Sequence, residues 1–592
     1  MSKKLSIKVC MGPAGMVAGG AEVLEAFKSA LDERNIKADF HEGCSAHKVG
    51  CRGLCAKDVL VEIDIDGNKT PYQLVKADMV ERIVEEHIVG GVPVKKWTGD
   101  ADYYAFFRKQ VRVLLSDCGE IDPEDINAYI AVGGYEATRK VLTSMTPEEV
   151  IQVMEDSGLR GRGGAGFPTG YKWKQCRKDR NEPKYIICNA DEGDPGAFMD
   201  RAVIEGNPHA LIEGMLIGAF SIGSNSGYVY IRAEYPLAVE RLKEAIAQAK
   251  AAGYLGKNIL GTGFDFDIKI NLGAGAFVCG ESTALMKSIE GRRGMPRPTP
   301  PRSVNKGLWA KPTVLNNVET FANVPYIIRH GAEWFASYGT EKSKGTKVFA
   351  LTGKIKNPGL IEVPMGITLK EIIYDIGGGI ENNKALKAVQ TGGPSGGCIP
   401  ANMMDISVDF ESLAKVGSIV GSGGMIVLDE DDCMVNMAKY FLHFTQEESC
   451  GKCVPCRIGT KRLYEILVRI TKGQGREGDI ELLKKLSDDV LDASLCGLGQ
   501  SAPNPILSTI QYFRDEYETH IKHKKCPAKV CRDLVTYKVI EDACKGCGAC
   551  LRACPAKAIT GEKKKPHLLN QALCIKCGSC FDVCKFKAIG RD

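Results

Sequence analysis

The chain has 592 residues, of which 26% are charged, and its formal net charge is +5. This length predicts several domains of roughly 100–200 residues each. So small a net charge argues against a nucleic-acid-binding protein, which concentrates basic residues in a patch or stripe. We find no run of the ~20 apolar residues that a membrane-spanning helix needs, and MSKKLSIKVC lacks the apolar core of a signal peptide. We therefore expect a cytoplasmic protein with no membrane span and no nucleic-acid partner.

Hydrophobic periodicity and composition divide the chain into six segments. The first resembles a small α/β unit, because the strand-like SIKVCMG is followed by the amphipathic AEVLEAFKSALDERN and the strand-like KDVLVEIDIDG. The third is rich in glycine, the fourth in β-strand patterns, and the fifth in helical patterns. The predicted segments are 1–90, a linker at 91–140, an α/β domain at 141–335, a β-rich domain at 345–430, a helical domain at 433–525, and a cysteine-dense module at 526–592.

Two cysteine runs of identical spacing, C-x2-C-x2-C-x3-C, lie near the end of the sequence. This spacing lets three thiolates hold one cubane from a single loop, while the fourth cysteine ligates the other cluster. Zinc is the chemical alternative, but zinc-binding cysteines usually occur in separated pairs. The chain has 24 cysteines, and in the cytoplasm clustered ones favour metal ligation over disulfides. The runs predict two [4Fe–4S] clusters, with ligands Cys544, Cys547, Cys550, Cys554, Cys574, Cys577, Cys580 and Cys584.

A third cluster is predicted in the helical segment. Cys450, Cys453 and Cys456 form a C-x2-C-x2-C run with no fourth cysteine close behind. A fully thiolate-ligated [4Fe–4S] cluster needs four thiolates, and Cys496 is the distant candidate for the fourth. A zinc site, or a site without a metal, is the alternative.

The α/β segment at 141–335 contains three glycine-rich stretches, at 158–173, 189–198 and 273–285. Glycines let backbone N–H groups approach a phosphate, and a helix N-terminus favours it electrostatically. Lys172 can supply a cation, while the side chains of Asn189 and Asp191 can hydrogen-bond ring edges and hydroxyls. A glycine-rich loop alone is weak evidence, but together these stretches predict a flavin or nucleotide pocket.

Five motifs then occur in a fixed order: RGRGGAGFPTGYKW, NADEGDPGAF, GAGAFVCGESTAL, KPTVLNNVET and ESCGKCVPCRIG. In this the chain resembles the flavin-binding subunit of NADH dehydrogenase (complex I). The added terminal segments make it most similar to the β subunit of electron-bifurcating [FeFe]-hydrogenases and related soluble NAD(P)-dependent oxidoreductases. The resemblance implies a multidomain α/β protein with a thioredoxin-like N-terminal domain, a Rossmann-like FMN domain, a β-grasp (SLBB-like) domain, a helical iron–sulfur domain and a C-terminal 2[4Fe–4S] ferredoxin domain.

The resemblance also implies an activity. NAD(H) or NADP(H) exchanges a hydride with FMN, and single electrons then pass through the clusters to ferredoxin or to partner subunits, by electron bifurcation in the bifurcating members. The implied partners are a small [2Fe–2S] thioredoxin-like subunit and a catalytic or iron–sulfur subunit. Glu192 and Asp194, beside the flavin, are the implied catalytic acids. The implied FMN-binding residues are Gly161, Gly163, Lys172, Asn189, Asp191, Gly280, Glu281, Asn316, Asn317 and Thr320.

The chain departs from the family pattern where the dinucleotide binds. Family members usually have tyrosine at Phe277 and a second acid at Ser282, and the loop PRPTPPRS has Thr299 for a lysine and Arg302 for an aromatic residue. Drift is one interpretation. Another is an altered electron donor, either NADP(H), whose extra phosphate Arg302 could meet, or a protein. A different class of function is an electron-relay or scaffold subunit whose FMN is reduced only through partner proteins.

The N-terminal segment departs from the pattern too. In the family, a C-x4-C pair and a C-x3-C pair hold a [2Fe–2S] cluster. Cys51 and Cys55 match the second pair and Cys10 begins the first, but Gly15 occupies its other position. Cys44 is a spare thiol with the wrong spacing. The segment therefore predicts either a degenerate [2Fe–2S] site or a docking module without a cluster.

Before the C-terminal module, Cys526 and Cys531 lie close in sequence to His520 and His523, and Cys433 precedes the helical segment. Thiolates combined with imidazole suit zinc. The prediction is a zinc site from Cys433, His520, Cys526 and Cys531, and the alternative is a set of reduced thiols in a hinge.

Overall fold

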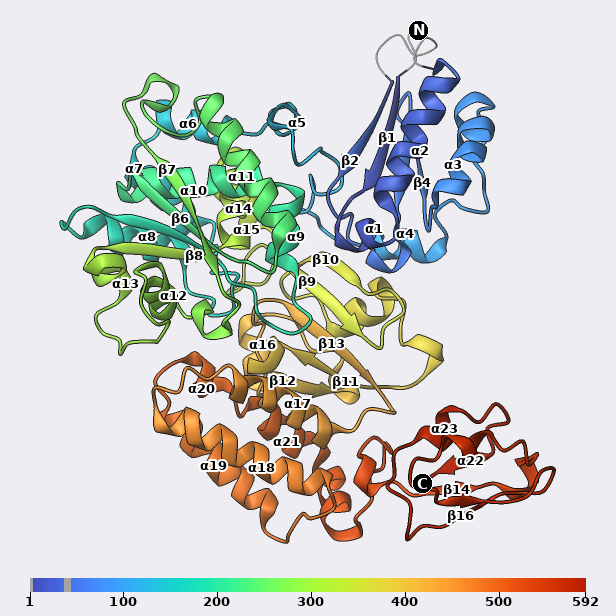
Figure 1. Cartoon of the computed structure of the whole chain (residues 1–592). Helices are drawn as coiled ribbons and strands as arrows, with labels where there is room; N and C mark the ends of the chain where they lie inside the picture. The colour runs from blue at the N-terminus through green and yellow to red at the C-terminus, as the bar shows by residue number, and fades with distance from the viewer. Residues whose placement is uncertain (1–3, 37–43) are drawn as a thin grey trace. The chain divides into compact units, whose positions relative to one another are not determined.

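The computed structural model describes residues 4–36 and 44–592, and the chain forms two compact units (Figure 1). The first comprises residues 1–384 and 388–427, and the second residues 385–387 and 428–592. Among the described residues, no helix combines the length and the apolar character needed to cross a bilayer.

The N-terminal domain is built on a four-stranded sheet in the order β2-β1-β3-β4. β1 (Leu5–Cys10) pairs in parallel with β2 (Cys44–Val49) across the helix α2 (Gly20–Glu33), and antiparallel with β3 (Val61–Ile65), which forms a hairpin with β4 (Asn68–Tyr72). Helix α2 buries Val23, Phe27 and Leu31 against this sheet, and α3 (Ala77–Ile83) follows. A parallel βαβ unit joined to an antiparallel hairpin and a second helix agrees with the predicted thioredoxin-like fold.

The glycine-rich segment folds around a parallel sheet in the order β7-β6-β5-β8. Its strands are β5 (Tyr185–Ala190), β6 (Ser226–Arg232), β7 (Asp267–Gly273) and β8 (Thr313–Asn317), and every pairing in it is parallel. The central strands β5 and β6 are mainly apolar and buried, as is typical of a parallel sheet covered by helices. The helices are α8 (Thr169–Lys178), α9 (Met199–Gly206), α10 (Pro208–Ile222), α11 (Pro236–Ala251), α12 (Ser282–Ile289) and α14 (Val318–His330). This confirms the Rossmann-like class, in which ligands bind at the carboxyl ends of the strands.

The segment at 91–140, expected as a linker, packs more closely than a linker would. It contains α4 (Ala101–Arg108), α5 (Ile126–Ala131) and the start of α6 (Glu136–Ser144). Val113, Leu114 and Leu115 are buried in the same hydrophobic core as the helices of the parallel-sheet domain. Their backbone is held as well, because Leu114 and Leu115 donate N–H groups to the buried carboxylate of Glu362. The second half of this segment is therefore part of a domain core.

The β-rich segment forms a five-stranded mixed sheet in the order β10-β9-β13-β11-β12. β9 (Thr346–Gly353) lies between β10 (Gly359–Pro364), its antiparallel partner, and β13 (Gly424–Asp429), its parallel partner. β11 (Leu386–Thr391) pairs antiparallel with β12 (Gly397–Pro400).

The second unit begins with antiparallel helices and ends in a small repeated module. Its main helices are α17 (Met434–Glu447), α18 (Thr460–Thr471), α19 (Asp479–Ala493) and α21 (Asn504–Glu518), which share one apolar core. In the C-terminal module, β14 (Tyr537–Val539) pairs with β17 (Ile589–Arg591), and β15 (Ile559–Thr560) pairs with β16 (Leu568–Leu569). Each cysteine run contains a short helix, α22 (Ala549–Ala553) in the first and α23 (Ser579–Asp582) in the second. The internal repeat of the sequence is thus a structural repeat.

Candidate functional site

A cavity of ≈ 560 Å³ opens where the strands of the parallel sheet end. Strands β5 and β8 are neighbours in the sheet and pair Asn189 with Asn317, so the motifs that contain these residues meet at one edge of the sheet. The glycine-rich loop before α8 and the turn before α12 complete the wall. Eight of the ten residues predicted to bind FMN line this cavity: Gly161, Gly163, Lys172, Asn189, Gly280, Glu281, Asn316 and Asn317.

The glycine-rich loop fits closely against the end of β8. A Cβ atom at Gly163 would lie 2.9 Å from the Cβ of Asn317, so a side chain there would force the two segments apart. The backbone N–H of Arg162 donates to Oγ1 of Thr320 at 2.9 Å. Thr320, which was predicted to bind FMN, does not line the cavity. It instead holds the glycine-rich loop, which does line it.

The amide side chains in the wall are held by partners that set their orientation. Trp173 donates its ring N–H to Oδ1 of Asn316 at 3.1 Å, and Asn189 donates from Nδ2 to the backbone carbonyl of Gly280 at 2.8 Å. Asn317 donates from Nδ2 to Asp200 at 2.5 Å. A ligand would meet a preorganised set of polar groups, which lowers the cost of binding.

Lys172 is a half-buried cation in the wall of the cavity. Its Nζ donates to the backbone carbonyl of Leu315 at 2.8 Å and lies 5.7 Å from the ring centroid of Phe167. Burial lowers the pKa of Lys172 to about 8, because a desolvated ammonium group is disfavoured. An anionic phosphate in the cavity would reverse this shift, and the lysine therefore fits an FMN phosphate.

We expect the affinity of the flavin-free chain for FMN to fall as the pH rises through about 8, because neutral Lys172 attracts a phosphate less strongly. Lys172→Met should weaken binding at pH 7 by about 1.5–3 kcal/mol, the range for a hydrogen bond to a charged group, and should abolish this pH dependence. Flavin fluorescence titrations measure both effects. The half-exposed Lys174, which pairs with Glu155, provides the control Lys174→Met; an unchanged pH profile in Lys172→Met would contradict the assignment.

The two predicted catalytic acids lie outside the lining of the cavity. The carboxylate of Glu192 accepts the backbone N–H groups of Asp200 and Arg201, at 2.9 and 3.1 Å, and thereby holds the start of α9. Asp194 accepts the hydroxyl of Ser422, and burial raises its pKa to about 6. Both contacts make these acids positioning groups for the segment after β5, and their catalytic role stays a prediction.

Asp191, predicted to bind FMN, is buried next to Gly280 and is not among the residues that line the cavity. A Cβ atom at Gly280 would lie 3.6 Å from its carbonyl oxygen. Glu281 lines the cavity and also caps α12, since its Oε2 accepts the N–H groups of Thr283 and Ala284 at 3.0 and 2.9 Å.

Three of the four departures from the family pattern, Ser282, Thr299 and Arg302, line the cavity. The guanidinium carbon of Arg302 lies 6.0 Å from the ring centroid of Phe167. Phe277 lies instead against Gly193, where a Cβ would come within 2.9 Å of its ring. Sequence reasoning missed other lining residues, of which Phe167, Tyr171 and Gln175 follow the glycines of the loop; their proximity to the motif was the available signal.

The structure brings together the four cysteines predicted for the helical domain. Cys456 lies in the turn η11 (Pro455–Gly459), and Cys496 immediately precedes α20 (Gly497–Ser501). Burial, together with the nearby thiols of Cys453, Cys496 and Cys450, raises the pKa of the Cys456 thiol to about 11. Four converging thiols are the ligand set of one [4Fe–4S] cluster.

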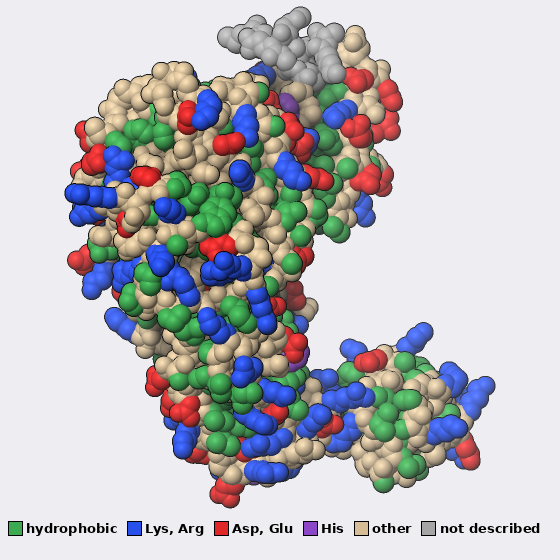
Figure 2. Space-filling model, turned by 60° about the vertical axis from the view of Figure 1, so that its left-hand side comes forward, with side chains coloured by type: hydrophobic (Ala, Val, Ile, Leu, Met, Phe, Trp, Pro, Cys, Tyr) green, Lys and Arg blue, Asp and Glu red, His purple; other side chains and the backbone are tan. Residues whose placement is uncertain are grey.

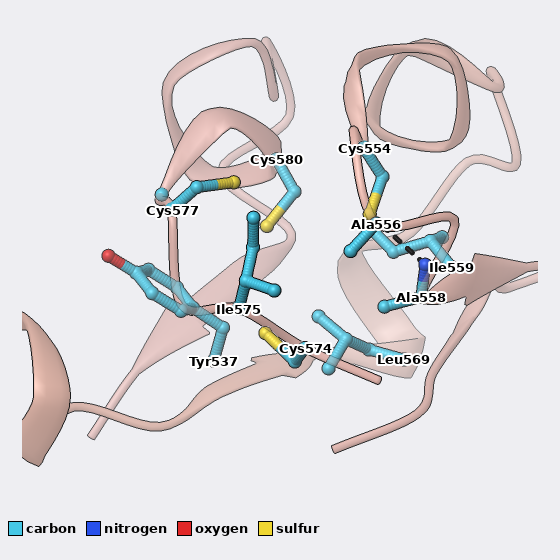
Figure 3. Close-up of a pocket in the computed structure, with 11 residues that line it drawn as sticks. Tyr537, Cys554, Ala556, Ala558, Ile559, Leu569, Cys574, Ile575, Cys577 and Cys580 are labelled. Atoms are coloured by element: carbon cyan, nitrogen blue, oxygen red, sulfur yellow. Dashed lines mark hydrogen bonds between the residues drawn. The ribbon is translucent and has the colours of Figure 1, made fainter. Parts of the chain in front are cut away.

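In the C-terminal module, one pocket combines cysteines from both runs (Figure 3). Cys574, Cys577 and Cys580 line it together with Cys554, the last cysteine of the first run. The backbone N–H of Ala558 donates to the Sγ of Cys554 at 3.2 Å, as the dashed line in Figure 3 shows. This position of Cys554 agrees with the exchanged fourth ligand expected of a two-cluster ferredoxin.

The first run has the corresponding three-thiol loop. Burial is the main cause that raises the pKa of the Cys550 thiol, and the neighbouring thiols of Cys544 and Cys547 contribute. At the end of the second run, Cys584 accepts the N–H of Ala588 at 3.2 Å, as Cys554 accepts that of Ala558.

A separate metal-binding geometry occurs at the end of the helical domain. Ligand atoms of Cys433, His520, Cys526 and Cys531 all lie within 4.8 Å of one another, and all four residues are buried. Nε2 of His520 lies 3.4 Å from the Sγ of Cys433 and 3.4 Å from that of Cys531. Nδ1 of His520 lies 2.7 Å from the carbonyl oxygen of Glu516, to which it can donate, leaving Nε2 as the ligand atom. His523 does not belong to this group.

The N-terminal thiols are also close together. The Sγ atoms of Cys51 and Cys55 are 3.7 Å apart, and the thiol of Cys10 interacts with that of Cys51. Cys44 pairs through its backbone with Leu5, five residues along β1 from Cys10, which corresponds to roughly 16 Å. The backbone of Cys44 is thus distant from that of Cys10. A Cβ at Gly15 would lie 3.5 Å from the Sγ of Cys10, so the position without a thiol adjoins the site.

The fold and these sites define a flavin- and iron–sulfur-binding oxidoreductase subunit. Family models match the Nuo51 FMN-binding domain at 154–326, the SLBB domain at 348–399, the NADH-ubiquinone oxidoreductase-F iron–sulfur binding region at 436–520, and a 4Fe–4S dicluster domain at 543–589. These matches confirm the predicted FMN-binding, SLBB, iron–sulfur and ferredoxin-like domains.

Individual relatives agree with the family models. The NADP-reducing hydrogenase subunit HndC of Solidesulfovibrio fructosivorans is 61% identical over 78% of this chain and 94% of its own length. An NADH-quinone oxidoreductase subunit of Rhizobium meliloti is 45% identical over 70% of this chain and 99% of its own. An NAD+-reducing [NiFe]-hydrogenase structure matches with a TM-score of 0.63 and 30% identity, over 88% of this chain and 84% of that one. The chain belongs to the family formed by these NADH-quinone oxidoreductase subunits and the related hydrogenase subunits.

Proposed function

We propose that this chain oxidises NADPH at FMN and passes the electrons through three [4Fe–4S] clusters to partner proteins. The cavity with Arg302 and Lys172 in its wall carries the proposal. When bound, FMN accepts a hydride from the nicotinamide and returns the two electrons singly. The chain's own residues hold the phosphate through Lys172, orient the flavin through fixed amides, and admit the dinucleotide beside Phe167.

Arg302 supports NADPH as the donor. Arginine recognises the 2′-phosphate that distinguishes NADP from NAD. Arg302 is exposed and lines the cavity, where the family pattern has an aromatic residue, so its charge can reach a ligand. The relative with 61% identity is named for NADP reduction, which agrees with NADP(H) rather than NAD(H) as the nucleotide that exchanges electrons with the flavin.

Anaerobic titration of the isolated chain should therefore bleach the flavin at lower concentrations of NADPH than of NADH. Arg302→Phe, which restores the family's aromatic residue, should weaken NADPH by about 1.5–3 kcal/mol and leave NADH unchanged or tighter. Arg292→Ala, an exposed arginine outside the cavity lining, controls for general positive charge.

Two results would each contradict this proposal. If NADH bleached the flavin with micromolar affinity and NADPH showed no advantage, NADPH would be excluded as the preferred donor. Failure of both nucleotides, with reduction only after a partner protein is added, would favour the relay or scaffold function instead.

The C-terminal module suits transfer to ferredoxin. Lys and Arg side chains are prominent on its visible face (Figure 2). The run Lys563, Lys564 and Lys565, between the cysteine runs, is exposed. Exposed cations accelerate encounter with an acidic partner. The relatives are subunits of multi-subunit complexes, and other subunits of such a complex are the further partners we propose. Electron bifurcation stays a prediction, and the two one-electron potentials of the bound flavin test it.

The group of Cys433, His520, Cys526 and Cys531 supports a second metal assignment, to zinc. Three thiols and one imidazole form a closed tetrahedral set, which is typical of a structural zinc site. Because all four residues are buried, the site leaves no open position for a substrate.

A further inference from the structure

The N-terminal domain contains three clustered thiols and, beside them, the carboxylate of Asp58. The family pattern gives this carboxylate no role in metal binding. Asp58 follows Cys55 by three residues, at the end of the turn η2 (Cys55–Lys57). Its Oδ1 accepts the backbone N–H of Leu60 at 3.1 Å. Its Oδ2 is buried and has no hydrogen-bond partner, although a buried carboxylate oxygen ordinarily has one.

The carboxyl group of Asp58 adjoins the thiol of Cys10, with which it interacts. Cys10 in turn adjoins Cys51, and Cys51 lies 3.7 Å from Cys55 between sulfur atoms. The four donor groups thus form a continuous row: Asp58, Cys10, Cys51 and Cys55. Asp58 lies beside Cys10, the thiol whose partner in the family pattern is replaced by Gly15 in this chain.

The row is too extended for one metal ion. Among the described residues, only the group at Cys433 has three or more such ligand atoms all within 4.8 Å of one another. Successive neighbours in the N-terminal row can be grouped as two pairs, Cys51 with Cys55 and Cys10 with Asp58. Two pairs of ligands suit two metal ions held side by side.

We propose that Asp58 is the fourth ligand of a two-iron, two-sulfide cluster in the N-terminal domain. Cys51 and Cys55 ligate one iron, and Cys10 and Asp58 ligate the other. The backbone N–H groups of Gly12 and Arg52 donate to the sulfur of Cys10. The backbone N–H of Gly53 donates to the sulfur of Cys51, at 3.3 Å between nitrogen and sulfur. Such N–H···S bonds accompany cluster-ligating thiolates. The assignment is independent of which donor reduces the flavin.

Oxygen ligation makes the two irons chemically different. Carboxylate is a harder ligand than thiolate, so the iron held by Asp58 has a distinct electronic environment. Mössbauer spectroscopy resolves this difference directly, because the ferric pair of a [2Fe–2S] cluster differs from the mixed-valence irons of the cubanes. The readout does not depend on enzymatic activity.

The test uses the full chain reconstituted anaerobically with ⁵⁷Fe and sulfide. The unmodified chain should hold about two irons beyond the twelve of three cubanes, seen as two ferric doublets of unequal isomer shift. Asp58→Cys should keep both irons and bring the doublets together. Asp58→Ala should lose about two irons, while the control Asp64→Ala, in β3 of the same domain, should lose none.

Three results would overturn the proposal. One is a chain with no [2Fe–2S] signal under conditions that fill the cubanes. Another is an Asp58→Ala spectrum identical to that of the unmodified chain. The third is an Asp58→Cys spectrum that keeps two unequal doublets, because the oxygen ligand would then come from elsewhere. Asp58→Cys guards against a folding defect in Asp58→Ala, since it is expected to retain the cluster.

Discussion

Replacing Cys496 by alanine should remove about four irons from the chain and leave FMN bound. The reason is that Cys496 is the fourth thiol of the group around Cys456, and a fully thiolate-ligated [4Fe–4S] cluster needs four. The cavity lined by Lys172 contains no residue of this cluster. NADPH should still bleach the flavin, while reduction of the C-terminal clusters by NADPH should fall by orders of magnitude. Iron analysis, flavin content and EPR of the NADPH-reduced chain measure the three quantities.

Cys398→Ala provides the matched control for Cys496→Ala. Cys398 is fully buried in the mixed sheet, where it contacts Gln390, and lies outside every thiol group described above. The Cys398→Ala variant should lose no iron. Full cluster content in Cys496→Ala, or undiminished reduction of the C-terminal clusters, would contradict the proposed ligand and the proposed path.

Cys496 also illustrates what could be predicted from the sequence. It lies about forty residues beyond the C-x2-C-x2-C run, so no local pattern identifies it. Thiolate chemistry does, because three adjacent cysteines demand a fourth and Cys496 is the candidate in the helical segment. The C-terminal clusters were easier to predict from the sequence, because each cysteine run has the complete spacing of a cluster-binding motif.

The location of the flavin cavity could be predicted from the sequence, but the contacts of its individual side chains could not. Its motifs mark loops at the ends of strands, and the pairing of β5 with β8 brings those loops together. Which side chain then faces the cavity depends on turn geometry that the motif does not encode. Thr320 therefore anchors the glycine-rich loop, and Glu192 holds the start of α9.

The interpretation of 91–140 as a linker failed to anticipate the packing for a related reason. Its apolar residues lack a strong helical or strand period, yet Val113 and Leu115 are buried through tertiary contacts. Asp58 escaped notice because a single carboxylate is common in any sequence. Its significance comes from an unpartnered oxygen beside Cys10, which only the three-dimensional structure reveals.

His520→Ala should release one zinc ion per chain and destabilise the end of the helical domain. The site joins Cys433, which caps the start of α17, to the turn η12 (Thr519–His523) and to the segment that leads into the C-terminal module. Structural zinc stabilises small folded domains by roughly 10–16 kcal/mol in apparent binding energy. Within a larger core the loss will be smaller, and we expect several kcal/mol, because three thiols stay buried without their metal.

The measurements for the zinc site are zinc content by mass spectrometry and hydrogen exchange of α17 and α21. His523→Ala is the matched control, since His523 is exposed, lies three residues away and does not belong to the group. Retained zinc with unchanged exchange in His520→Ala would contradict the assignment. Zinc affinity should also decrease as the pH falls, because binding requires deprotonated thiols and a neutral imidazole. A chelator at mildly acidic pH should therefore reproduce, in the unmodified chain, the hydrogen-exchange pattern that His520→Ala produces in α17 and α21.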